Sequence, residues 1–170
     1  MLFIKFIKNY TDPGPLAILN LTVIDYLYKK FPNATSHQLA FPRTKSVCAQ
    51  SFASIAVRKL GLHRLMLYNS MELNAAIDRY VPILQEATPS EIIHQGWKYD
   101  PPKALSDIFE SIIGAVLVDS NYDYDKTAMV AEYVMKDILE ILSPSLAKDP
   151  VSELCEWISG SGCRRNAEFR

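Results

Sequence analysis

Apolar residues recur at spacings of three and four along most of this chain, which is the pattern of helices that bury one face. In the first such run, Leu16, Leu19, Val23 and Leu27 predict a helix that ends near residues 31–32. The same spacing predicts helices over 47–60, 70–81, 124–142 and 150–158, a carboxylate-bearing helix after the break at 99–102 and a short helix from 89, with a loop over 33–42 and either an extended run or a helical turn over 62–68. We therefore expect an all-α fold, built as a single helical bundle.

Two carboxylates interrupt the most apolar of these helices. Asp107 and Glu110 are three residues apart, so a helix places them on one face, about one turn from each other. Burying ionised carboxylates is costly without a counter-charge, and a divalent cation shared by both would supply one. A second interpretation is that both are ordinary acidic residues in the first turns after Pro102, where negative charge favours the helix dipole.

The residues around the pair extend the pattern. The run PKALSDIFESIIGAVLVDS at 102–120, with GWKYDPP before it, Asn121-Tyr122 after it and AVRKLGLH at 56–63, resembles the ribonuclease III family. Within that family the resemblance is closest to the C-terminal (second) nuclease domain of fungal Dicer-like proteins. It implies a ribonuclease III-type helical bundle that hydrolyses double-stranded RNA with Mg²⁺ or Mn²⁺. It also implies that Asp107 and Glu110 are catalytic metal ligands, and that Lys103 binds substrate beside the scissile phosphate.

The first acidic signature of the family is lost. Where members carry LEFLGDAVLDYL, this chain has LAILNLTVIDYL at 16–27, so that Ala17 and Leu21 stand at the positions of a Glu and an Asp. Asp25 lies one turn beyond Leu21, and the narrow geometry of a two-metal site favours a structural or capping role for it. We therefore expect weak or absent metal binding and cleavage reduced by orders of magnitude. A truncated or misread start and a genuinely degenerate domain both explain the change.

These observations leave three functions open. The first is processing of double-stranded RNA by an impaired endoribonuclease domain. The alternative is a noncatalytic dimerisation module, because family domains act in pairs, so the expected partners are double-stranded RNA and another ribonuclease III domain, in a homo- or heterodimer. The third is a ribosome-associated relative that has lost its carboxylates, which would need an organellar address or a basic surface that the sequence does not display.

The length of the chain fits a single domain, and its net charge is close to zero. The 170 residues are 49% hydrophobic with a formal net charge of −1, so RNA contacts would need local cations, for which Arg43, Lys45, Arg58 and Lys59 are candidates. Three cysteines without metal spacing, and no span for a membrane, predict an intracellular protein of cytoplasm or nucleus. We expect an atypical N-terminal segment at 1–15, the ribonuclease III-like domain at 16–158 and a linker-like tail at 159–170 without a double-stranded RNA-binding domain.

Overall fold

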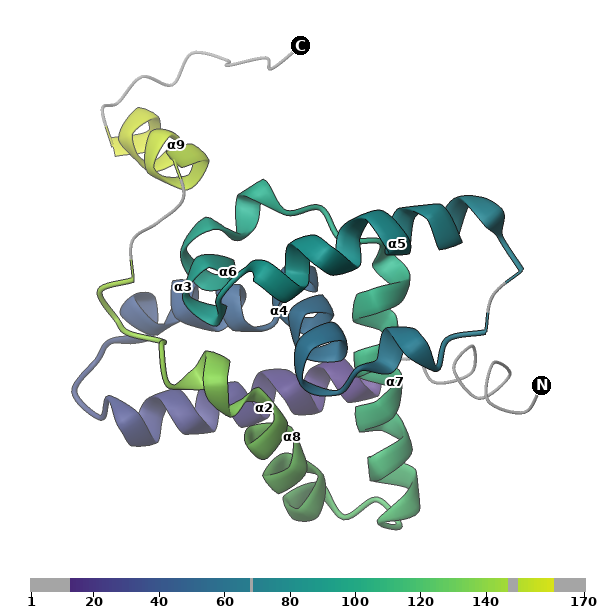
Figure 1. The fold of residues 1–170 in the computed structure, drawn as a ribbon. Helices are drawn as coiled ribbons and strands as arrows, with labels where there is room; N and C mark the ends of the chain where they lie inside the picture. Colours follow the sequence, from purple (N-terminus) through teal and green to yellow (C-terminus); the bar gives the residue numbers. More distant parts are fainter. Residues whose placement is uncertain (1–12, 68, 147–149, 161–170) are drawn as a thin grey trace.

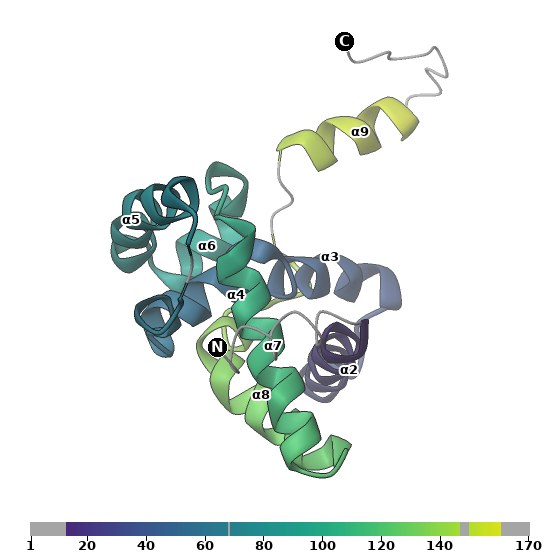
Figure 2. The same cartoon turned by 90° about the vertical axis from the view of Figure 1, so that its right-hand side faces the viewer.

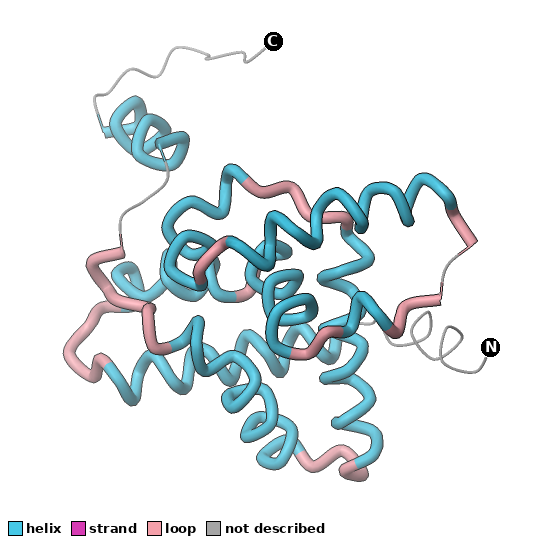
Figure 3. The backbone as a smooth tube through the Cα atoms, viewed as in Figure 1, coloured by secondary structure: helices cyan, strands magenta, loops and turns pink. Residues whose placement is uncertain are grey.

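Helices make up the fold, which we describe from a computed structural model (Figure 1) that covers residues 13–67, 69–146 and 150–160. The long helices are α2 (Pro13–Lys30), α3 (Ser36–Ser46), α5 (Met71–Glu86), α7 (Lys103–Asp119), α8 (Tyr124–Leu139) and α9 (Pro150–Gly160). The shorter ones are α4 (Ala49–Ser54), α6 (Pro89–Gln95), the π-turn η1 (Ile55–Lys59) and the 3₁₀ turns η2 (Leu62–Arg64) and η3 (Gly96–Lys98). Figure 3 shows no strand in these ranges, so the predicted all-α class is confirmed.

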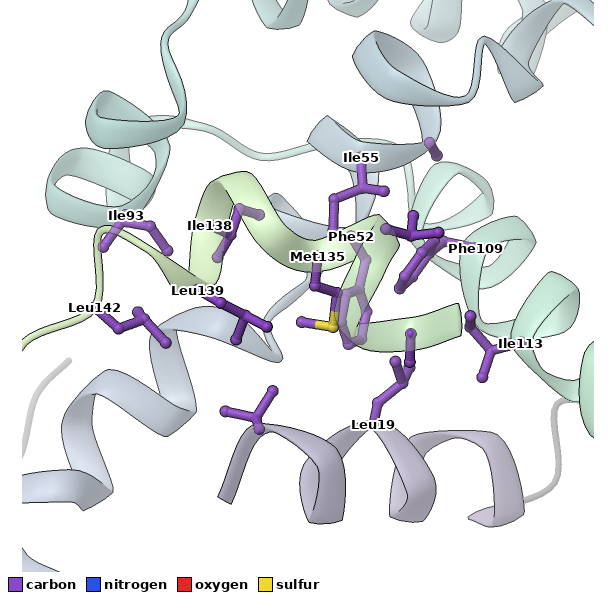
Figure 4. Packing of buried hydrophobic residues seen from close by; sticks show 14 of the residues in the cluster. Leu19, Phe52, Ile55, Ile93, Phe109, Ile113, Met135, Ile138, Leu139 and Leu142 are labelled. Carbon is purple, nitrogen blue, oxygen red and sulfur yellow. The ribbon is translucent and has the colours of Figure 1, made fainter. Parts of the chain in front are cut away.

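Two apolar clusters hold the helices together, and α7 contributes to both. Phe109 belongs to the larger cluster, where its ring lies 5.1 Å from that of Phe52 on α4, with an angle of 38° between the ring planes. Leu19 of α2 and Met135 of α8 belong to the same cluster (Figure 4). Leu105, one turn earlier on α7, belongs instead to a smaller cluster with α5 and α6. These clusters fix the rotation of α7 about its axis, and with it the direction of its carboxylates.

A single lysine joins the ends of α2 and α8. The ammonium of Lys30 donates to the carbonyl oxygens of Leu139, Glu140 and Leu142 at 3.1, 2.8 and 3.3 Å. These carbonyls stand at the C-terminal end of α8, where backbone acceptors lack partners within the helix and the helix dipole favours a cation. The contact therefore ties the first long helix to the last helix of the bundle.

The loop predicted over 33–42 is wrong, because α3 begins at Ser36. Thr35 and Gln38 form a capping box, in which each side chain accepts a hydrogen bond from the other residue's backbone N–H. Leu39 and Pro42 are buried on the inner side of α3. Apolar residues are too sparse here to show helical spacing, so only the cap could have revealed the helix.

Other boundaries also differ from the sequence prediction. The helix expected to stop before Pro82 continues to Glu86, with Pro82 exposed inside α5.

The helix predicted over 47–60 is confirmed as helical from Ala49, but its second half widens into η1, where the N–H of Leu60 donates to the carbonyl of Ile55. Gly61 then ends it with a φ of +63°, a conformation that glycine adopts without strain. Residues 62–64 form a 3₁₀ turn, which settles the alternative left open for that run.

Helix α9 lies to one side of the bundle, as the turned view in Figure 2 shows. Its Leu154 and Trp157 are exposed. Residues 1–12 and 161–170, which hold most of the predicted N-terminal segment and linker-like tail, lie outside the described residues. Across the described ranges, no helix combines the length and hydrophobicity needed to cross a membrane.

Candidate active site

Helix α7 presents its two carboxylates beside a buried apolar face. The helix begins at Lys103 and its first turn contains no acidic residue, so Asp107 and Glu110 do not cap it; the interpretation of both as surface carboxylates stays open. Leu105, Ile108 and Phe109 are buried between and beside them. Because these neighbours face the core, Asp107 and Glu110 lie at the edge of the bundle and only partly in solvent.

The carboxylate of Asp107 is occupied by a lysine of its own helix. The Nζ atom of Lys103 lies 2.7 Å from Oδ1 and 2.8 Å from Oδ2, an i,i+4 ion pair in which both oxygens accept. This hydrogen bond raises the pKa of Lys103 above its ordinary value. The sequence predicted Lys103 as a substrate-binding residue; the structure places its ammonium on the first of the two predicted metal ligands.

The carboxylate of Glu110 is partly buried. Burial, and to a smaller degree the charge of Asp107, raises the pKa of Glu110, while the charge of Lys103 acts in the opposite direction. The influence of Asp107 shows that the two carboxylates are near enough to interact, as their spacing on the helix predicts. Asp107 and Glu110 therefore lie on the same side of α7.

Ala17 and Leu21 on α2, at the positions of the lost acidic signature, have side chains without oxygen atoms that could bind a metal. Ala17 is exposed and the side chain of Leu21 is 64% exposed, so neither is a core residue that had to be apolar. Asp25 does not replace them, because its carboxylate forms an i,i+4 ion pair with Lys29.

A resident divalent ion does not fit these donors. Mg²⁺ in enzymes that act on phosphates is commonly held by one or two carboxylates, with water and substrate oxygens completing an octahedron. Here one of the two carboxylates has both oxygens on an ammonium, which leaves Glu110 alone. Within 13–67, 69–146 and 150–160, no three His, Cys, Asp or Glu side chains are grouped so that they could hold a metal.

The other predicted RNA-contacting cations are dispersed. Lys59 binds to α8: its ammonium lies 3.2 Å from both the carboxylate of Asp137 and the carbonyl oxygen of Tyr133. Arg43 and Lys45 lie on α3 rather than in a loop, and Lys45 stands over the ring of Phe41 at 5.2 Å. Lys59 and Lys45 are thus engaged with groups of the protein itself.

The sequence did not reveal a cavity between α2 and α8. It has a volume of about 500 Å³ and is lined on one side by Ile18, Leu21 and Asp25 and on the other by Tyr124 and Met129. Leu21 and Met129 are largely exposed at its edge. Only the spacing of exposed apolar residues on α8 could have hinted at it, and that signal is no different from ordinary surface variation.

Comparison with known proteins connects this geometry to a family. The model of the ribonuclease III domain matches residues 16–121. Endoribonuclease Dcr-1 of Drosophila melanogaster is 34% identical over 150 residues, covering 82% of this chain and 7% of that protein. Protein Dicer of Schizosaccharomyces pombe is 28% identical over 149 residues, covering 86% and 11%. Endoribonuclease Dicer homolog 2 of Arabidopsis thaliana is 33% identical over 144 residues, covering 82% and 10%. The chain thus spans about a tenth of the length of the curated relatives it matches.

Proposed function

This chain belongs to the ribonuclease III family, and from that premise we propose that residues 16–158 form a domain for processing double-stranded RNA whose own cleavage is strongly impaired. The proposal rests on one observation: few of the carboxylates expected at the acidic site are present and free to bind a metal. Ala17 and Leu21 offer no oxygen, and Lys103 holds the carboxylate of Asp107. Among the predicted ligands, only Glu110 remains for chemistry.

The expected loss follows from the demands of phosphodiester hydrolysis. Metal-assisted cleavage requires ions that are positioned to activate water and to stabilise the leaving oxygen, and small displacements are costly. A site that lacks half of its carboxylates holds an ion loosely or not at all. We therefore expect RNA cleavage by this chain to be slower by at least about 100-fold than with a restored acidic signature.

The restoring experiment uses both missing positions. Purified wild-type protein, Ala17→Glu, Leu21→Asp and the double variant are incubated with a long RNA duplex and Mg²⁺ or Mn²⁺. The control is the uncharged pair Ala17→Gln with Leu21→Asn, which has the same size. Because both positions are exposed, the new carboxylates avoid the cost of burial.

Discrete short products from the charged double variant, and none from wild type or the uncharged control, would support the proposal. Wild-type cleavage at the rate of the double variant would refute impairment. Binding of the duplex is measured alongside in a gel-shift assay, so that a loss of cleavage is not confused with a loss of RNA affinity.

A second candidate function is a noncatalytic dimerisation module, and the cavity between α2 and α8 favours it. Apolar Leu21 and Met129 are 64% and 72% exposed beside a concavity of about 500 Å³. Exposed apolar surface next to a cavity of this size is typical of a protein-binding site. The loss of charge at position 21 increases the apolar area there, which suits pairing with another ribonuclease III domain better than it suits catalysis.

Sedimentation tests this second candidate. Wild type should self-associate or bind a catalytically intact ribonuclease III domain, and Met129→Lys should weaken the association by placing a charge at the cavity. Leu67→Lys, at a residue equally exposed but outside the lining, is the matched control. A wild-type chain that stays monomeric at all concentrations and captures no intact domain would eliminate the pairing function.

A further inference from the structure

We infer that Lys103 is the resident cation of this site: its ammonium occupies the carboxylate of Asp107 and thereby weakens the binding of divalent ions. The inference deepens the proposed function, on which it rests for the identity of the site, but it concerns binding rather than cleavage. It departs from the substrate-binding role that the sequence predicts for Lys103.

The first argument is geometric. Lys103 is the first residue of α7 and Asp107 is one turn later, so the helix itself brings the two side chains together. Both oxygens of Asp107 lie within 2.8 Å of the same nitrogen. A metal ion could coordinate either oxygen only by displacing the ammonium or by approaching close to it.

The second argument is a balance of charge. Ala17 and Leu21 bring no charge, and the charges that act on Glu110 are those of Asp107 and Lys103, so the formal charges of these three α7 residues sum to −1. A full set of four carboxylates would outweigh one ammonium, so a lysine at this place would not prevent metal binding there. The same lysine becomes decisive only because the acids on α2 are gone.

The third argument concerns the size of the effect. A divalent ion can displace the ammonium of Lys103 from Asp107, but it needs a higher concentration to do so than it would without the lysine. The Lys103 side chain is 82% exposed and is not wedged in place by packing, whereas Asp107 is 25% exposed. Removing a unit positive charge about 5 Å from a divalent ion, with solvent screening, should strengthen binding by about ten-fold. The effect is therefore large enough to detect by titration.

The test is a titration with Mn²⁺, which is followed by the electron paramagnetic resonance signal of the free ion. Wild type is compared with Lys103→Met, which keeps the length of the side chain without its charge. The matched control is Lys136→Met, which removes the lysine of another exposed i,i+4 ion pair, on α8 with Glu140. A third variant, Lys103→Met with Asp107→Asn, reports whether any gained site uses Asp107. Far-UV circular dichroism verifies that each variant is folded.

We expect Lys103→Met to bind Mn²⁺ about ten-fold more tightly than wild type, and we expect Lys136→Met to bind like wild type. Adding Asp107→Asn should abolish the gain. Unchanged or weaker Mn²⁺ binding by Lys103→Met would overturn the inference, as would a gain that persists without the Asp107 carboxylate. The proposed function fails on a different result, namely efficient RNA cleavage by wild type, so the two failures are distinguishable.

Discussion

The packing of Phe109 is expected to set the orientation of the Asp107 and Glu110 carboxylates on α7. This residue stands between Asp107 and Glu110 in the sequence, is fully buried, and packs its ring 5.1 Å from that of Phe52 on α4. If this contact sets the rotation of α7, then Phe109→Ala should both destabilise the domain and loosen the positions of the two carboxylates.

The magnitude follows from the burial. A buried phenylalanine removes about 200 Å² of surface from water, which at about 25 cal/mol per Å² amounts to about 5 kcal/mol. Large-to-small replacements of buried aromatic residues cost about 3–5 kcal/mol, and partial collapse of the cavity accounts for the spread. We therefore expect a loss of about 4 kcal/mol, a large share of the stability of a domain of this size.

Urea denaturation followed by circular dichroism measures this loss. With a slope of about 2 kcal/mol per molar urea, the midpoint should fall by about 2 M. Phe52→Ala and the double variant complete a cycle, in which the ring contact should appear as a coupling of about 0.5–1.5 kcal/mol. Met71→Ala, at a residue that is 88% exposed, should shift the midpoint little. A Phe109→Ala midpoint that matches that of Met71→Ala would refute the assigned packing.

Three further variants test local features of the bundle. Because burial raises the pKa of Glu110 from its ordinary value of 4.5, its charged form is disfavoured in the folded state, and stability falls as the pH rises from 4.5 through the folded pKa. Glu110→Gln should therefore be more stable than wild type in urea at pH 7, with a difference that disappears below pH 4.5; a difference that grew on acidification would contradict the assigned cause. Lys30→Met removes the cation from three carbonyls near the α8 terminus and should cost about 1–2 kcal/mol of unfolding free energy, whereas its neighbour Lys29→Met removes only an exposed ion pair and should cost clearly less. Equal losses in these two lysine variants would show that the carbonyl contacts do not stabilise the fold.

Several features were predictable because they depend on neighbours in the sequence. The amphipathic pattern of 103–119 predicted α7 and the shared side of Asp107 and Glu110, and both are confirmed. The absence of carboxylates at positions 17 and 21 can be seen directly in the sequence and does not depend on the fold. The helix α3 was missed because its residues pack through only a few apolar positions, so that the capping box, not periodicity, defines it.

The sequence by itself determined the helical class, the family resemblance and the missing oxygen donors on α2, because helical periodicity and residue identity are local properties. Tertiary structure decided which side of each helix is buried and where α2 and α8 leave a cavity, because these depend on contacts between segments about a hundred residues apart. The pairing of Lys103 with Asp107 lies between the two cases: its i,i+4 spacing was visible in the sequence, but that both oxygens of Asp107 accept from the ammonium was seen only in the structure.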